Sequence, residues 1–341
     1  MKSNRTSYLF LACLFLLGVL FLLNLSLGSV KIGFSEILEG IFTDHWERAS
    51  YREIILNFRL PKALVAILVG IGLSLSGLQM QTFFRNPLAG PYVLGISSGA
   101  GFGVAILILA GSALGFTMGG VSPWSTAFAG IFGAGSILLL VSVVAWRVRD
   151  SMTLLIVGVM FGATVSALIS VMAYFSQAES LKLYTIWSLG SLGGLGWYQV
   201  VILAVLILIG AIPVLASTRS FNALLLGESY AESMGINSLR LRWLVIISTG
   251  ILAGGITAFC GPIAFVGIAV PHLARLIWKS PDHRVLFPGS ALVGAGLLLL
   301  CDTISQLPGS AQTLPINAVT SLVGAPVVIG LVIKRNFSKE F

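Results

Sequence analysis

Uncharged apolar runs of about 20 residues recur along almost the whole sequence, and they restrict the fold more than any other feature. A helix of roughly that length crosses the hydrocarbon core of a bilayer, and the visible runs allow about ten such helices. Only 9% of the residues are charged, whereas about a quarter are charged in a typical soluble domain. We therefore predict an all-α, polytopic membrane protein whose single transmembrane domain covers residues 1–341.

The first apolar run extends from Tyr8 to about Leu27 and follows the basic residues Lys2 and Arg5. A secretory signal peptide has a shorter apolar core of about 7–15 residues, followed by a small-residue cleavage site. This run is longer and shows no convincing cleavage site. It is therefore interpreted as a first span that starts in the cytoplasm.

The basic residues indicate the orientation of the spans. When the runs alternate across the membrane, 14 of the 20 Lys and Arg residues fall on one side and 6 on the other. The side rich in Lys and Arg is the cytoplasmic one. The sequence thus predicts a multi-pass protein of the cytoplasmic (inner) membrane with both termini in the cytoplasm. The net charge of +8 is explained by this distribution and does not indicate nucleic-acid binding.

The other spans follow in order. They are expected at about 59–84, from 94, at 125–145, at 152–175, up to 216, at 243–259, at 261–275, at 285–304 and from 316. Residues 28–58 are expected to form an external loop with at most a short helix, and 176–197 an external, partly re-entrant stretch.

Small residues recur at helical spacing within several spans. Gly70, Ser74 and Gly77 share one face of the second span, which permits close packing against another helix. In the fifth span the small residues stand at every fourth position, namely Gly158, Gly162, Ser166 and Ser170. Helix packing is the favoured explanation of each stripe, although a narrow substrate path would also need small side chains.

The segment 219–242 is the longest polar interruption in the second half of the chain. Three of its apolar residues share a helix face, namely Leu226, Tyr230 and Met234. Gly235 suits the left-handed position that ends a helix, and Ala231 and Gly235 are small enough for another surface to come close. A short cytoplasmic helix is predicted. It is either a connector on the lipid or water surface, or a place where another protein binds.

Motifs for enzymatic chemistry are missing from the sequence. There is no HExxH, no GxSxG and no Walker A sequence, so this chain is not expected to hydrolyse ATP through a P-loop. Cys13, Cys260 and Cys301 lie in or beside apolar runs and lack the spacing of metal ligands. We expect no catalytic residues, no metal site and no cofactor bound by this chain.

Asp302 is the one carboxylate placed well inside an apolar run. An ionisable residue inside the membrane is a functional candidate. A single acid is nevertheless a poor basis for proton-coupled transport, which usually needs several. We therefore interpret Asp302 as structural, bonded to a nearby Ser, Thr or backbone group.

Several motifs in a fixed order resemble those of the FecCD-type permeases of ATP-binding-cassette (ABC) importers, which take up iron chelates, haem and cobalamin. The motifs are Arg59-Leu60-Pro61, Arg85-Asn86-Pro87-Leu88-Ala89, Leu94-Gly95-Ile96-Ser97-Ser98-Gly99-Ala100, Trp187-Ser188-Leu189-Gly190-Ser191, Leu226-Gly227 with Gly235-Ile236, the run from Gly261 to Arg275, Asp282-His283-Arg284, Leu314-Pro315, and Gly324-Ala325-Pro326. The resemblance spans nearly the whole chain.

This resemblance implies a type II importer permease that works as a homodimer of ten-helix subunits. Two cytoplasmic ATPase subunits, which carry ATP and Mg, would bind below, and an extracytoplasmic substrate-binding protein would dock above. The loop 219–242 would be the ATPase-coupling element, through Leu226, Gly227, Glu228, Ala231, Met234, Gly235 and Ile236. Arg59 and Lys62 would dock the binding protein. The translocation path and inner gate would include Ser151, Met152, Gly158, Gly162 and Ser166.

The sequence departs from the family pattern at two positions. Gln306 stands where the family often has Arg, and Thr313 stands where it often has Glu. One outer docking charge and one polar contact are therefore in doubt. The resemblance favours an iron chelate (siderophore or haem) as cargo, with cobalamin as the alternative. An ion-driven secondary transporter is the alternative of a different class.

Overall fold

The computed structural model describes residues 2–111, 122–148, 150–307, 310 and 312–337. The described residues are helical without a strand. Seven of the helices in this part are long and apolar enough to cross a membrane, and three shorter apolar helices accompany them. The structure thus confirms the all-α prediction of about ten spans.

The helices that form the bundle are α1 (Lys2–Ser26), α4 (Leu60–Phe83), α5 (Ile96–Ile108), α6 (Pro123–Arg147), α7 (Ser151–Phe175), α9 (Trp197–Ala216), α12 (Ser238–Thr249), the π-helical turn η4 (Gly250–Gly254), α13 (Gly255–Cys260), α14 (Val266–Trp278), α15 (His283–Ser305) and α16 (Ile316–Phe337). The shorter elements at the ends and in connections are α2 (Phe34–Thr43), α3 (Ala49–Glu53), η1 (Ile54–Arg59), η2 (Pro91–Leu94), α8 (Ala178–Ser188), α10 (Thr218–Leu224) and α11 (Glu228–Ser233).

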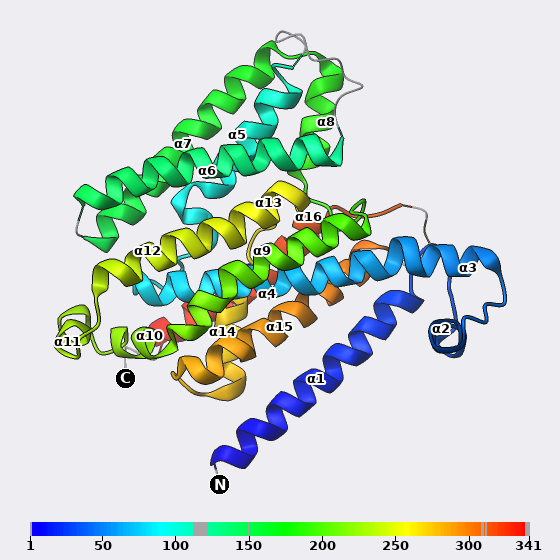
Figure 1. The fold of residues 1–341 in the computed structure, drawn as a ribbon, viewed down its shortest axis with the longest axis horizontal. Coiled ribbons are helices and arrows are strands. Elements are labelled where there is room, and N and C mark those ends of the chain that lie inside the picture. Colours follow the sequence, from blue (N-terminus) through cyan, green and yellow to red (C-terminus); the bar gives the residue numbers. More distant parts are fainter. Residues whose placement is uncertain (1, 112–121, 149, 308–309, 311, 338–341) are drawn as a thin grey trace.

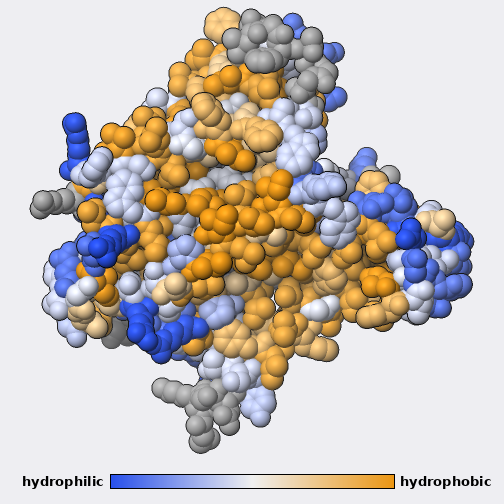
Figure 2. Space-filling view, in the orientation of Figure 1, coloured by the Kyte–Doolittle hydropathy of each residue, from blue (hydrophilic) through white to orange (hydrophobic). Residues whose placement is uncertain are grey.

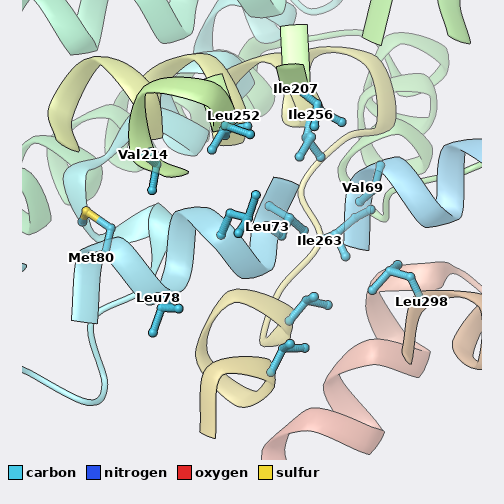
Figure 3. Close-up of a cluster of buried hydrophobic side chains, with 14 of the residues drawn as sticks. Val69, Leu73, Leu78, Met80, Ile207, Val214, Leu252, Ile256, Ile263 and Leu298 are labelled. Atoms are coloured by element: carbon cyan, nitrogen blue, oxygen red, sulfur yellow. The ribbon is translucent and has the colours of Figure 1, made fainter. Parts of the chain in front are cut away.

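Helix α4 occupies the centre of the bundle. In Figure 1, α5, α6, α7 and α8 lie on one side of α4, and α14, α15 and α1 lie on the other. In the most apolar stretch of the helix that contains α4, 78% of the residues are buried, whereas the corresponding share in α1 is 17%. Figure 3 shows Val69 and Leu73 of α4 among apolar side chains of α9, η4 and α13.

The small-residue face of α4 brings backbones together. A Cβ added to Gly70 would lie 2.3 Å from the carbonyl oxygen of Gly294 in α15, and one added to Gly77 would lie 1.7 Å from that of Gly267 in α14. Neither position can hold a side chain without moving a neighbouring backbone. The packing role predicted for this stripe is confirmed.

The eighth predicted span is shorter than its apolar run. Residues 261–265 are not helical, and α14 begins only at Val266. The polar backbone of this irregular segment is satisfied within the protein: the Tyr92 hydroxyl donates to the Ile263 carbonyl at 2.5 Å and accepts from its N–H at 3.1 Å, while Ala264 N–H donates to Asn317 Oδ1 at 2.9 Å. Non-helical backbone inside a membrane protein requires such partners.

Three other boundaries differ from the prediction. Residues 49–58, expected in an external loop, continue α4 outward as one helical segment, Ala49–Phe83. The third span is a 13-residue helix that starts at Ile96 after the turn at Gly95, where φ is 71°. The predicted re-entrant stretch contains an 11-residue helix, α8.

Hydrophilic residues gather at two opposite ends of the bundle. Figure 2 shows an apolar middle, with hydrophilic atoms near α10 and α11 at one end and near α2 and α3 at the other. Helix α1 starts and α16 ends toward the α11 side (Figure 1). This distribution is that of a protein whose apolar belt lies in a bilayer.

Candidate functional site

The cytoplasmic loop predicted from sequence contains a separate short helix, α11, between two glycines in left-handed or extended positive-φ conformations. Gly227 has φ 122° and precedes it, and Gly235 has φ 83° and follows it. The N–H of Ile236 donates to Ala231 O at 3.1 Å, and that of Gly235 to Glu232 O at 2.9 Å. This pair of bonds is a Schellman C-terminal cap, which places a left-handed residue after the helix. Gly235 therefore ends α11, as predicted.

Apolar side chains of this loop face away from the bundle. Leu226, Tyr230 and Met234 are 66%, 52% and 60% exposed. Glu228 is half-buried, and Glu232 is exposed. The loop thus presents an apolar face with carboxylates beside it.

The sequence suggested that Ala231 lets another surface come close, and the structure does not agree. Ala231 is fully buried against the protein itself, because it lies on the inner side of α11. Ile236 is half-buried and packs on the main core. These two residues hold α11 in place, whereas a Cβ at Gly235 would meet nothing within 4 Å.

A polar network ties this loop to the spans. Asn222 of α10 donates to Asp282 Oδ1 at 2.7 Å, and its Oδ1 accepts from the backbone N–H and from Nδ1 of His283, both at 2.8 Å. Nε2 of the same imidazole lies 2.8 Å from the Thr82 hydroxyl of α4, within hydrogen-bond distance. The loop is therefore joined to both α15 and the central α4.

Sequence reasoning missed Asn222, His283 and Thr82 as a group. Asn222 and Thr82 are ordinary polar residues at helix ends, and 201 positions separate Thr82 from His283. Only Asp282-His283 stood in a recognised motif. No pattern in the sequence links these positions.

The proposed inner gate lies at the start of α7. Asp150 caps this helix: its Oδ2 accepts from the Thr153 hydroxyl at 2.6 Å and from the Thr153 N–H at 2.7 Å. These bonds hold the pKa of the Asp150 carboxyl below its usual value. Met152 is 52% exposed. Ser151 is the first residue of α7, and its side chain lies outside the described part of the structure.

The small residues of α7 divide into two groups. Gly158 and Gly162 lie against Gly95. A Cβ added to Gly95 would be 2.9 Å from Gly158 O and 3.1 Å from Gly162 N. This close approach supports the packing interpretation. Ser166 lies on the exposed surface, with its hydroxyl bonded back to Gly162 O at 2.9 Å.

At the opposite end, Arg59 does not have the exposed position expected of a docking residue. It is only 7% exposed, and its guanidinium donates to the carbonyls of Leu25 and Ser26 at 2.7 and 3.1 Å and also to that of Val30. Arg59 fixes the turn after α1 instead, so its assignment to docking is corrected.

Lys62 is likewise engaged inside the protein. Its ammonium nitrogen lies 2.9 Å from Asp302 Oδ1, and its side chain is 21% exposed. This pair argues against a free docking charge at Lys62.

Asp302 is the centre of a buried polar cluster. Besides Lys62, Asn24 Nδ2 donates to Asp302 Oδ2 at 2.9 Å, and Gln306 Nε2 donates to the same oxygen at 2.8 Å. The cluster joins α1, α4 and α15. The structural interpretation of Asp302 agrees with this geometry, but the predicted Ser, Thr or backbone partners are wrong. Gln306, first read as a departure from the family pattern, supplies one of the bonds.

The described residues hold no group of three or more His, Cys, Asp or Glu side chains placed to bind a metal ion. Asp302 is also the only buried carboxylate in the described part of the chain.

Comparison with known proteins agrees with this arrangement. The model of the FecCD transport family matches residues 16–334. The vitamin B12 import system permease protein BtuC of Citrobacter koseri is 38% identical over 289 residues, 85% of each chain, and that of Salmonella arizonae is 37% identical over 289 residues, with the same coverage.

Solved structures give the same result. A structure described as an inward-facing conformation of a putative metal-chelate type ABC transporter matches with a TM-score of 0.84 and 30% identity, over 96% of this chain and 99% of that one. PsaBC from Streptococcus pneumoniae, solved with a Fab, matches with a TM-score of 0.54 and 14% identity, over 87% and 94%. That second similarity concerns the fold alone. The chain belongs to the FecCD transport family of ABC importer permeases.

Proposed function

We propose that this permease imports a bulky metal chelate and is driven by a separate ATPase that binds the cytoplasmic loop. The observation that carries the proposal is the exposed apolar face of Leu226, Tyr230 and Met234 at the hydrophilic end of a membrane bundle. Such a face needs a protein or lipid partner. A motor on another polypeptide fits because the sequence holds no P-loop.

The loop is suited to transmit force. Gly227 and Gly235 fix the direction of α11, and Ala231 anchors it to the bundle. A push on α11 passes to the adjoining α10, from which Asn222 and His283 carry it to α15 and Thr82 carries it to α4. Because α4 is central, its displacement can alternate access from one side of the membrane to the other.

The partners follow from the same proposal. We infer a homodimer, two cytoplasmic ATPase subunits that carry ATP and Mg, and an extracytoplasmic binding protein. This chain would bind no cofactor and catalyse no reaction. It would lie in the cytoplasmic membrane with both termini inside. A second copy could cover part of α7, where Met160 and Ser166 are exposed.

The cargo is proposed at the level of its chemistry. An iron chelate, siderophore or haem, is the first candidate from the sequence motifs. The relatives named above are vitamin B12 permeases, and the solved relative is described as metal-chelate type, so cobalamin is a strong alternative. All three are large metal complexes. Binding of each to the partner binding protein would distinguish them.

Ion-driven transport is the alternative of another class. It requires buried coupling carboxylates, and Asp302 is already bonded to three side chains. This geometry favours the ATP-driven proposal.

The proposal is tested by reconstitution in liposomes with the ATPase and the binding protein. We expect cargo to accumulate only with ATP and to continue when ionophores collapse the ion gradients. Uptake without nucleotide that stops on adding ionophore would overturn the proposal and support the secondary transporter.

A further inference from the structure

We propose that α2 is an interfacial helix, seated flat in the membrane leaflet at the end of the bundle remote from α11, with its apolar face among lipid chains. The α2 apolar face consists of Phe34, Leu38, Ile41 and Phe42. These side chains are 46%, 43%, 43% and 82% exposed. The proposal depends on neither the cargo nor the ATPase.

The ten residues of α2 divide into three sectors around its axis. At about 100° per residue, Phe34, Leu38, Ile41 and Phe42 fall within one continuous arc. Ser35, Glu39 and Thr43 fall on the next arc and are exposed.

The third sector consists of Glu36, Ile37 and Gly40 and faces the protein, with Glu36 half-buried. Ile37 is fully buried, and Gly40 is buried with it. A helix with one side on the protein, one apolar side and one polar side has the pattern of a helix lying along a membrane boundary. A helix surrounded by water would not need the exposed apolar arc.

The position of α2 matches the boundary. Only the turn 27–33 separates it from α1, and Arg59 binds the carbonyls of Leu25, Ser26 and Val30. This holds α2 at the level where α1 leaves the membrane. In Figure 1, α2 is seen nearly end-on beside the outer end of α1, whereas α1, α4 and α15 run across the view. Its axis therefore lies across the direction of the spans.

One tryptophan lies beside the outward extension of α4. Trp197, at the start of α9, donates its indole N–H to Leu56 O at 3.1 Å and is 41% exposed. Tryptophan is enriched at the membrane–water boundary.

The rotation of α2 about its axis is fixed. The indole of Trp46 lies against the backbone at Gly40, where an added Cβ would be 2.5 Å from the ring. Trp46 also donates to Asp44, which is paired with Arg52 at 3.1 Å. The apolar arc is thus held toward one direction and does not turn freely into the protein.

The polar residues specify the kind of lipid contact. Helix α2 carries Glu36 and Glu39 and no Lys or Arg. The helix itself therefore offers no cation to anionic lipid headgroups, and burial of its apolar arc is the term that seats it. The expected occupant is the acyl region of any bilayer lipid, including a zwitterionic one.

Fluorescent labels on single cysteines test the proposal in the full-length protein. The background variant replaces Cys13, Cys260 and Cys301 with Ala, and the label is placed at Phe42→Cys or, as the matched control, at Glu39→Cys. Each protein is reconstituted in phosphatidylcholine vesicles, and quenching by brominated acyl chains is compared with quenching by iodide in the outer water. Monodisperse elution in detergent verifies that each variant folds.

We expect bromolipid to quench the label at position 42 several-fold more than the label at 39, and iodide to show the reverse. Adding phosphatidylglycerol should leave both results unchanged. Iodide quenching at 42 without bromolipid quenching would overturn the proposal. Loss of iodide access at 42 only when the binding protein is added would also overturn it, because the face would then dock a protein.

Discussion

Lys62 Nζ and Asp302 Oδ1 lie 2.9 Å apart and join the outer part of α4 to the outer part of α15. The carboxylate is 1% exposed, and its second oxygen accepts from Asn24 and Gln306. A charge buried in this way is tolerated because every side of it meets an opposite charge or a donor.

Removal of one partner of this pair should destabilise the protein. Lys62→Met leaves the Asp302 carboxylate buried without its cation, a change that costs about 3–5 kcal/mol in buried pairs. We expect a loss of stability near the lower end of this range, because the lysine side chain is 21% exposed and water can partly replace it. Thermal unfolding in detergent, without any binding protein present, measures the effect.

The double variant Lys62→Met with Asp302→Leu is the control. It removes both charges and should recover most of the lost stability. If Lys62→Met unfolds at the native temperature but fails to bind the partner binding protein, Lys62 is a docking residue and the structural assignment is wrong.

The sequence was sufficient to predict the class of fold and the order of the spans. Hydrophobicity and length decide where a helix can cross a membrane, so α6, α7 and α15 begin and end within about three residues of their predicted bounds, the usual precision of a helix end. The end of α11 was also predictable, because Gly235 adopts a conformation that few other residues tolerate.

The partners of charged residues were not predictable. Arg59 follows an external loop, and its exposure there was a reasonable expectation; its burial depends on carbonyls at Leu25 and Val30, far from it in sequence. Asp302 likewise takes partners from α1 and α4. Composition locates a charge along the chain, but only tertiary packing decides what it meets.

The broken eighth span shows the same limit. Its apolar run continues through 261–265, yet the helix begins at Val266 because Phe265 has φ 66° and the preceding backbone bonds to Tyr92 and Asn317. Hydrophobicity does not distinguish helix from buried irregular backbone.

Gly235→Val should uncouple ATP hydrolysis from uptake. The left-handed conformation at φ 83° costs a residue with a side chain about 1–2 kcal/mol, and more for a β-branched one. We expect α11 to lose its cap while the spans stay intact, because a side chain there meets no atom within 4 Å. Uptake and ATPase activity of the reconstituted complex are the two measurements.

Gly235→Asn is the matched control, since asparagine tolerates the left-handed region. It should retain most of the uptake. Equal uptake by the Val variant and the native protein would contradict a coupling role for α11.

Asn222→Ala should weaken the connection between the loop and the spans. It removes one donor and one acceptor that serve Asp282 and His283, and an unsatisfied buried group costs about 1–3 kcal/mol. We expect normal membrane assembly, retained ATP hydrolysis and reduced uptake. A variant that assembles and transports like the native protein would show that the network does not transmit the movement.

Acid should loosen the start of α7. The pKa of Asp150 is lowered in the folded protein by its bonds from Thr153. Its stabilisation of the helix end is therefore complete above the ordinary aspartate pKa and is lost as the pH falls through the lowered value. A spin label at Met152→Cys should gain mobility over that acidic range. Asp150→Ser retains a cap without a titrating group, so its label should show no such transition.

Gly77→Ala should be among the most harmful single changes in the chain. Its new methyl carbon would start 1.7 Å from the carbonyl oxygen of Gly267, so α4 and α14 must separate at the centre of the bundle. Overpacking costs about 1–3 kcal/mol and occasionally more. A collision with rigid backbone places the loss of stability in this variant at or above that range.

Gly135→Ala is the control, because Gly135 is exposed on α6 and a Cβ added there meets nothing within 4 Å. In a helix interior alanine is favoured over glycine by about 1 kcal/mol, so this variant should unfold at or above the native temperature. Similar unfolding temperatures for the two variants would mean that α4 and α14 do not approach as closely as described.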